Sequence, residues 1–455
     1  MSSIRSWILN IIYAAIVVVG SPWLLWRFIK GKSRRGWGQK LFGSIDPPIE
    51  VASSVHDSQE LIWIHAVSVG EVNLLGSILQ EFKSRDPEIK FAISTTTETG
   101  YDLAKSKYPD CYLFFCPFDF TWAIKRVLKR LKPSALVLTE LELWPNLIAT
   151  ARRCGVPVVV ANGRLSEKSA RGYGKFSWFL KPSFEKLSLV LCQSQTYADR
   201  FVGLGCHWTA VKVTGNVKFD GVETDRQNIA TQNLVQLSGL EEPEVVFLAG
   251  STQLEEDLIA AKAFHELAPE YPQLRLVLAP RHPKRVGELV SHLEQLGIEI
   301  LLRSKLNSDP RRGNCESPIK PVLIIDTIGE LGAWWGRANI AYVGGSMGSR
   351  EGQNMIEPAA YGVPVSFGPR TKNFHDLVTE LIASDAATVV KNQSELRDFM
   401  QRCLDDPTAA QAAGSRGQQV VLNHAGASAR TVDAILDLVR GVQGQAQPIQ
   451  ISDAA

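Results

Sequence analysis

Short apolar runs rich in β-branched and aromatic residues alternate, along most of the chain, with longer stretches of helical periodicity. The runs before residue 216 are LIWIHAV, FAISTTT, YLFFCP, ALVLTE, PVVVAN, LSLVLCQS and VKVTG, and those after residue 244 are VVFLAGS, LRLVLAP, IEILLRS, PVLIIDT, IAYVGG and PVSFG. This alternation predicts parallel sheets whose strands are joined by crossover helices. Because the polar segment 221–244 interrupts the pattern, we predict an α/β protein with two Rossmann-like halves facing a central cleft, where ligands bind at the carboxyl ends of the strands.

The N-terminal 35 residues follow a different pattern. No charged residue lies between Ser6 and Trp26, and this run is about as long as a helix needs to cross a bilayer. We predict a membrane anchor, with a cleaved signal peptide, or monotopic insertion because of Pro22, as the alternatives. Basic residues follow at positions 27, 30, 32, 34, 35 and 40. They place the main body in the cytoplasm by the positive-inside rule, and they suit anionic lipid head groups.

Composition excludes several classes of function. The chain has 455 residues, 45% hydrophobic and 21% charged, which is enough for two domains, and its net charge of +2 does not favour nucleic acid as a partner. The seven cysteines form no CxxC pair, which indicates reduced, buried thiols, and the histidines have no metal-binding spacing. Without an Asp-x-Asp pair or a Walker lysine, we expect no metal or other cofactor. The tail 441–455 is predicted to be disordered.

Four charged residues of the first half follow predicted strands. Glu71 lies in the first turn of the helix after HAVSVG, where a carboxylate is either a dipole-stabilising helix starter or a general base. Glu140 and Glu142 lie two apart in TELELWPNL, so at most one is expected to face the cleft, and Glu142 is the better candidate for a capping role. Lys218 in GNVKFD suits a phosphate or sugar carboxylate, although a solvated surface lysine is the usual alternative.

The second half carries features typical of a nucleotide-phosphate site. Pro280 and Arg281 follow a strand, where a guanidinium can fork onto a phosphate. The backbone of Ile328, Gly329 and Glu330 at a helix start is suited to a base edge. In AYVGGSMGSREGQNMIEPAA, Gly344 and Gly345 allow close approach of a ligand, the next helix offers unpaired N–H groups near Asn354, and Glu357 suits ribose hydroxyls. An ordinary α/β turn is the alternative.

Taken in order, these motifs resemble those of the 3-deoxy-D-manno-octulosonic acid (Kdo) transferases, which are membrane-associated glycosyltransferases of the GT-B fold. The resemblance extends to about residue 425 and rests on HAVSVGEV, ELWPNL, NGRLSEKSARGYGK, GNVKFD, PRHPKR, DTIGELG and FGPRTKNFHD. It implies an anchor and basic segment at 1–35, an acceptor-binding domain at 36–225 and a CMP-sugar-binding domain at 240–440. It also implies inverting transfer of Kdo from CMP-Kdo to a lipid A precursor (lipid IVA) in lipopolysaccharide biosynthesis, at the cytoplasmic face of the inner membrane.

The resemblance also assigns roles to individual residues. Glu71 is similar to the family's general base, and Glu140 and Lys218 to its transition-state stabilisers. Its CMP contacts correspond to Pro280, Arg281, Ile328, Gly329, Glu330, Asn354, Met355, Ile356 and Glu357. The chain departs from the family pattern at Gln253 and Gln353, where histidines are usual, and glutamine cannot gain charge near neutral pH. The competing hypotheses are a GT-B enzyme that uses a nucleotide diphosphate sugar, or acts as an epimerase, and a silent membrane-anchored sugar-binding protein.

Overall fold

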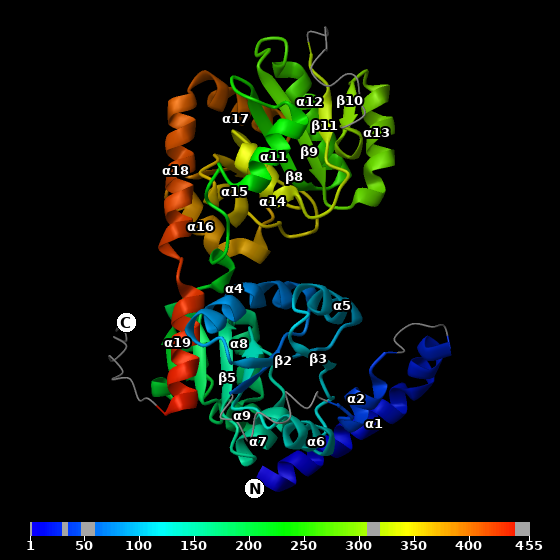
Figure 1. Cartoon of the computed structure of the whole chain (residues 1–455), viewed down its shortest axis with the longest axis vertical. Coiled ribbons are helices and arrows are strands. Elements are labelled where there is room, and N and C mark those ends of the chain that lie inside the picture. Colours follow the sequence, from blue (N-terminus) through cyan, green and yellow to red (C-terminus); the bar gives the residue numbers. More distant parts are fainter. Residues whose placement is uncertain (1, 30–34, 47–59, 307–318, 442–455) are drawn as a thin grey trace. The chain divides into compact units, whose positions relative to one another are not determined.

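The computed structural model describes residues 2–29, 35–46, 60–306 and 319–441, which form two compact α/β units (Figure 1). Unit 1 comprises the described residues of Met1–Gly221 and Ala425–Ala455, and unit 2 is Val222–His424. Each contains one seven-stranded sheet in which all of the pairings are parallel. The predicted α/β class and the two parallel-sheet halves are therefore confirmed.

The sheet of unit 1 has the strand order β3-β2-β1-β4-β5-β6-β7. Its strands are β1 Leu61–His65, β2 Lys90–Thr95, β3 Tyr112–Phe115, β4 Ala135–Thr139, β5 Val158–Gly163, β6 Leu189–Cys192 and β7 Val211–Val213. Its helices are α1 Ser2–Ile29, α2 Trp37–Phe42, α4 Val69–Arg85, α5 Glu98–Lys107, α6 Thr121–Leu131, α7 Pro145–Arg153, α8 Glu167–Lys175, α9 Ser177–Phe184, α10 Gln195–Gly203 and α19 Ala427–Arg440, with short η2 Trp208–Ala210 and η3 Val217–Phe219. Alternate residues of β1 enter separate cores, Leu61 and Trp63 on one face and Ile62 and Ile64 on the other, so its first four residues are all apolar.

Unit 2 repeats this plan with the strand order β10-β11-β9-β8-β12-β13-β14. Its strands are β8 Val245–Thr252, β9 Leu274–Pro280, β10 Ile300–Leu302, β11 Val322–Ile324, β12 Ile340–Val343, β13 Val365–Phe367 and β14 Ala387–Val389. Its helices are α11 Ile229–Ser238, α12 Leu254–Leu267, α13 Val286–Gln295, α14 Leu331–Arg337, α15 Ile356–Ala360, α16 His375–Ala383, α17 Gln393–Asp405 and α18 Pro407–Asn423, with short η4 Pro283–Arg285, η5 Arg303–Lys305 and η6 Lys372–Phe374.

Helix α19 differs from the predicted domain boundary, which placed residues up to 440 in the second half. It lies in unit 1, where Val432 and Ile435 enter the same core as Ile62 and Ile64 (Figure 1). The pattern of α19 predicts an amphipathic helix but does not identify the sheet that its apolar face covers. Unit 1 is therefore built from two segments that are distant in sequence.

Helix α1 forms over the apolar N-terminal run, and its polar side chains contact unit 1. Arg5 donates to the Ser183 hydroxyl at 2.8 Å. The Asn10 side chain donates to the Thr121 hydroxyl at 2.7 Å and accepts from the Asn146 side chain at 3.2 Å. Within the described residues, no helix combines the length and apolarity needed to cross a membrane. Parts of the basic segment and the predicted disordered tail, 442–455, lie outside the described residues.

The cysteine prediction is confirmed only in part. The six cysteines in the described ranges are free thiols, of which Cys116, Cys192 and Cys206 are buried. Cys154 at the end of α7 is exposed, so the expectation of buried thiols is wrong for that residue.

Candidate active site

Glu71 occupies the carboxyl edge of the unit 1 sheet, in the first turn of α4. Its Oε2 accepts from the Val67 amide at 2.9 Å and from the Thr139 hydroxyl at 2.6 Å, and its Oε1 accepts from the Ser68 hydroxyl at 3.2 Å. Thr139 is the last residue of β4, which neighbours β1 in the sheet. Two adjacent strand ends therefore fix one carboxylate, and the serine of the Ser-x-Gly sequence supplies one of its donors.

The surroundings of Glu71 raise the pKa of its carboxyl. Burial is the main cause, and the negative charge of Glu140 adds to it, while the hydrogen bonds from Thr139, Val67 and Ser68 oppose it. A base with a raised pKa accepts a proton more readily than an ordinary glutamate does. The site therefore favours a carboxylate that takes a proton at a higher pH than an exposed glutamate does.

Glu140 and Lys218 form an ion pair beside Glu71. Lys218 Nζ lies 3.2 Å from Glu140 Oε1, and both side chains remain about a third exposed, with relative exposures of 31% and 30%. Glu140 has a left-handed φ of 55°, which is rare for a residue other than glycine, and its amide donates to the Ala161 carbonyl at 2.9 Å. Strained backbone of this kind at a strand end is typical of functional sites, and it turns Glu140 toward the lysine.

Two further polar residues at this edge have structural partners. The Trp144 indole donates to Glu142 Oε2 at 3.1 Å, which agrees with the supporting role considered for Glu142. Burial, and then the charge of Glu71, raise the pKa of Glu142, so three carboxyls share this edge. His65 is fully buried and its Nδ1 lies 2.9 Å from the Ser94 hydroxyl, and burial lowers its pKa to about 4. His65 is therefore neutral near pH 7.

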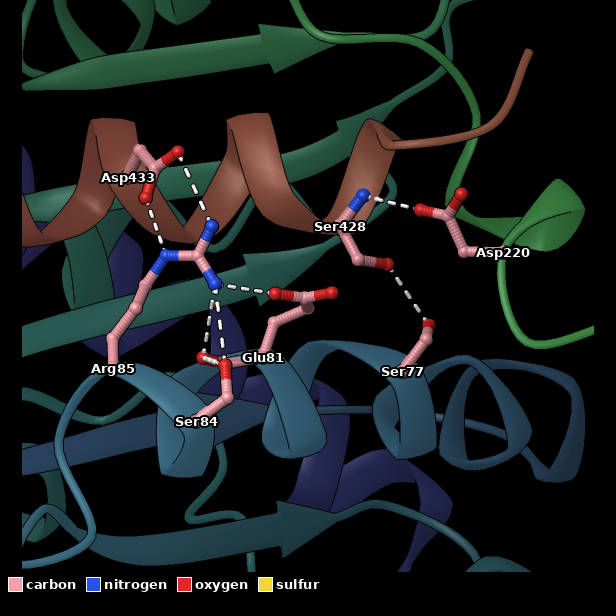
Figure 2. Close-up of polar contacts among 7 residues, drawn as sticks. All are labelled: Ser77, Glu81, Ser84, Arg85, Asp220, Ser428 and Asp433. Carbon is pink, nitrogen blue, oxygen red and sulfur yellow. Dashed lines mark hydrogen bonds and ion pairs between the residues drawn. The ribbon is translucent and has the colours of Figure 1, made fainter. Parts of the chain in front are cut away.

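Helix α19 supports the elements that carry Glu71 and Lys218, as Figure 2 shows. The Asp220 carboxylate, two residues after Lys218, accepts from the amides of Gly426, at 2.7 Å, and Ser428 at the start of α19. The Ser428 hydroxyl bonds Ser77 of α4 at 2.9 Å, and Arg85 at the other end of α4 pairs with Asp433. Sequence reasoning missed Asp220 and Thr139, although both lie within the motifs it selected.

In unit 2, Pro280 ends β9 and Arg281 follows it. The Arg281 amide donates to the Thr252 carbonyl at 3.0 Å, which fixes the backbone, and its side chain is exposed. Arg281 is therefore available to an anionic ligand at the carboxyl end of the strand. Ile328 is 86% exposed and Gly329 has a φ of 92°, so this turn presents backbone to solvent.

The Glu330 side chain has internal partners. Its two carboxylate oxygens accept from Arg303 and from the Thr327 hydroxyl, each at 2.7 Å. Glu330 therefore closes the loop before α14, and only its backbone corresponds to the predicted recognition of a base edge.

The predicted helix at Asn354 begins later and is shorter than expected. Helix α15 has five residues and starts at Ile356, whose amide donates to Asn354 Oδ1 at 3.1 Å, so a dipole argument has little support. Met355 and Ile356 are buried, and their side chains pack in the core. The Asn354 amide donates to Glu357 Oε1 at 2.9 Å, while burial raises the pKa of Glu357.

The described residues contain no group of three or more His, Cys, Asp or Glu side chains that could hold a metal ion. The independence from metal that the sequence predicts stays a prediction.

Comparison with known proteins decides the family. The family model for 3-deoxy-D-manno-octulosonic-acid transferase (kdotransferase) matches residues 35–221. The 3-deoxy-D-manno-octulosonic acid transferase of Bordetella pertussis is 31% identical over 426 residues, which are 91% of this chain and 96% of that protein. The enzyme of the same name from Haemophilus influenzae is 30% identical over 376 residues, covering 82% of this chain and 86% of the relative.

The chain belongs to the Kdo transferases. It is therefore a glycosyltransferase, as the resemblance implied. Among solved structures, the UDP-GlcNAc 2-epimerase from Neisseria meningitidis bound to UDP-GlcNAc has a TM-score of 0.58 at 14% identity, covering 83% of this chain and all of that one. At that identity the likeness supports a common two-domain fold only, and for this Kdo transferase it carries nothing about the ligand.

Proposed function

We propose that the chain transfers Kdo from CMP-Kdo to a lipid A precursor, with inversion and with Glu71 as the general base. The observation that carries this proposal is the Glu71 carboxylate, which has a raised pKa and is held by three donors beside the Glu140–Lys218 pair. The CMP-Kdo donor and the lipid IVA acceptor are those expected from the resemblance.

In the proposed reaction, an acceptor hydroxyl oxygen attacks the anomeric carbon of Kdo and the bond from that carbon to the phosphate oxygen of CMP breaks. The hydroxyl proton passes to Glu71, and CMP leaves with the bonding electrons. Glu140 and Lys218 stabilise the charge that develops in the transition state, because a fixed ion pair needs little reorganisation as the reaction proceeds. No metal is required, since the leaving group is a monophosphate rather than a diphosphate.

Unit 2 is proposed to hold the donor. Arg281 would contact the phosphate through its guanidinium, together with Pro280, and the exposed turn 328–330 would contact the base through its backbone. Asn354 and Glu357 would bind the ribose, while the buried Met355 and Ile356 would contribute backbone groups only.

Helix α1 is proposed to hold the enzyme at the cytoplasmic face of the inner membrane. Its outward residues are apolar, and Ile4, Trp7, Ile8, Ile11, Ile12 and Ile16 are all exposed. Its polar residues Arg5 and Asn10 bond to the body of unit 1 instead. Trp178 on α9 is also exposed, at 81%, and Phe179 lies under the Arg5 guanidinium, so we assign Trp178 to the same lipid-facing surface.

The proposal is tested by assaying transfer of Kdo from CMP-Kdo, generated in place, to a tetraacyl lipid A precursor in the presence of EDTA. Wild type is expected to form product, and Glu71→Gln is expected to lose activity by about 10² to 10⁴-fold with CMP binding retained. Glu167→Gln, which alters an exposed first-turn glutamate of α8, is the matched control and should remain active. Activity of Glu71→Gln close to wild type would exclude Glu71 as the base.

A further inference from the structure

The turn after β12 contains a buried carboxylate supplied by another element. Glu256 lies in the first turn of α12 and is 2% exposed. Its Oε2 accepts from the Gly345 amide at 2.7 Å, and its Oε1 accepts from the amides of Ser346 and Met347, each at 2.9 Å. The Tyr342 hydroxyl also donates to Oε1 at 3.0 Å. One side chain thus takes three consecutive backbone N–H groups of the turn.

Three consecutive N–H groups that converge on one point form the arrangement by which glycine-rich turns bind phosphate. Here the internal carboxylate occupies that position. The N–H groups of residues 345–347 are therefore not free to bind a nucleotide phosphate. The two glycines are needed for the conformation of the turn itself. A β-carbon on Gly344 would lie 2.4 Å from Thr252 Cα, and Gly345 has a left-handed φ of 68°.

The two positions where the chain departs from the family pattern lie beside this carboxylate and the turn that it holds. Gln253 caps α12, and its backbone N–H donates to Glu256 Oε2 at 2.8 Å. A β-carbon on Gly345 would lie 2.9 Å from Cγ of Gln353, so that side chain covers the turn. The Gly345 carbonyl accepts from the Gly352 amide at 2.8 Å, which links the turn to the segment leading to Asn354 and Glu357.

We propose that Glu256 is a positioning residue of the donor site. It fixes the turn 344–347 from beneath, and through Gly352 it sets the place of Asn354 and Glu357, while the donor phosphate is held by groups outside this turn. The inference rests on the proposed function because it takes Asn354 and Glu357 as donor contacts. Glu256 itself touches no substrate.

The test compares Glu256→Gln with Glu255→Gln, since Glu255 is the adjacent glutamate and is exposed. CMP and cytidine affinities are measured by calorimetry on the full chain, KM values are measured for donor and acceptor, and amide hydrogen exchange is followed by mass spectrometry over 340–357. For Glu256→Gln we expect at least about 10-fold weaker CMP binding, a raised donor KM, an unchanged acceptor KM and faster exchange. Glu255→Gln is expected to match wild type in all four.

Two results would overturn the proposal. Unchanged exchange in Glu256→Gln would mean that the carboxylate does not hold the turn. Faster exchange together with CMP binding as tight as in wild type would mean that the turn does not position the donor. Faster exchange together with CMP binding that is tighter relative to cytidine would mean that the N–H groups of the turn bind phosphate once Glu256 no longer occupies them. If wild type binds no CMP, the proposed donor fails, and hydrogen exchange still decides whether Glu256 holds the turn.

A milder variant covers the case in which Glu256→Gln does not fold. Tyr342→Phe removes one donor to Oε1 and leaves the three backbone bonds in place. It should fold and show smaller changes of the same kind, in exchange and in donor KM. Wild-type values for both quantities in Tyr342→Phe would count against the proposal.

Discussion

At the scale of single residues, the environment of Glu71 is more informative than its identity. A glutamate in a first helical turn is common, but this one is buried, has three hydrogen-bond donors and lies near a second carboxylate. Burial raises its pKa and the donors lower it, so each donor adjusts the pKa of the proposed base.

The pH dependence of the reaction follows from this balance. A general base works only when deprotonated, so activity should fall as pH drops through the raised pKa of Glu71, at a higher pH than an ordinary glutamate would give. Thr139→Val removes a hydrogen bond that favours the charged form. We expect the acidic limb of the kcat/KM profile to move to higher pH in this variant.

Thr139→Ser is the control for that profile, since it keeps the hydroxyl and should restore the wild-type limb. An identical limb in wild type and Thr139→Val would show that the titrating group is not Glu71.

Arg281 gives a prediction about the donor. Arg281→Ala should weaken CMP binding by about 1.5 to 3 kcal/mol, because a charge-assisted contact to phosphate is lost. Calorimetric titration with CMP measures the change, and cytidine should bind both proteins alike. Arg285→Ala, an exposed neighbour in η4, tests whether general positive charge suffices. Equal losses in the two variants would remove the specific role of Arg281.

Residue positions could be predicted where one strand end determines them. Glu71 and Glu140 follow β1 and β4, which are neighbours in the sheet. Lys218 follows the edge strand β7, so its ion pair with Glu140 does not follow from the strand order. The partner of the glycine turn could not be predicted, because Glu256 reaches it from another element about 90 positions away in sequence. The burial of Met355 and Ile356 could not be predicted either, because a sequence motif gives residue types and not the directions of their side chains.

At the scale of elements, local patterns predict strands well and predict helix partners poorly. All thirteen apolar runs form strands, while β14 was missed because its three residues lack a comparable apolar run. Helix α19 was assigned to the wrong half, since its apolar stripe fits any sheet face. The contacts that distinguish its position are polar and long-range, and they involve Asp220, Ser77 and Arg85.

Asp220 should therefore matter more to stability than an exposed ion pair on the same helix. Asp220→Ala removes a carboxylate that caps α19, and helix caps contribute about 0.5 to 2 kcal/mol. Asp433→Ala breaks a partly exposed pair with Arg85, where such pairs contribute about 0.2 to 1 kcal/mol. We expect the Tm of the unit 1 transition, measured by calorimetry, to fall further for Asp220→Ala than for Asp433→Ala. A larger fall for Asp433→Ala would contradict the assigned role of the cap.

At the scale of the whole molecule, each unit contains a buried aspartic acid whose pKa folding raises well above its ordinary value. Burial raises the pKa of Asp119 in unit 1 to about 7 and that of Asp257 in unit 2 to about 8, from an ordinary value of 3.8. A carboxyl whose pKa is raised by folding stabilises the fold fully below its unfolded pKa. That contribution is lost as pH rises through the folded pKa.

Both units should consequently lose thermal stability as pH rises from the unfolded pKa of 3.8 to the folded values of about 7 in unit 1 and about 8 in unit 2. Asp257→Asn imitates the protonated form and can still accept the hydroxyl of Thr252, so it should flatten the pH dependence of the unit 2 transition. Asp119 remains in that variant, which leaves the unit 1 transition as an internal control. Scanning calorimetry at several pH values measures both. If the Tm of unit 2 in Asp257→Asn changed with pH as steeply as in wild type, the pH dependence would belong to groups other than Asp257.

The return of α19 to unit 1 also determines when that unit can finish folding. Arg85 and Asp433 are 348 positions apart in sequence, and the whole of unit 2 lies between the two segments that form unit 1. On the ribosome, the residues that form the unit 1 sheet emerge before unit 2, but the helix that covers one of its faces emerges after unit 2. Unit 2 is one continuous segment, so it can complete its contacts earlier, while one face of the unit 1 sheet still lacks its helix. Unit 1 therefore completes its core only after α19 has been made, and until then one apolar face of its sheet stays uncovered.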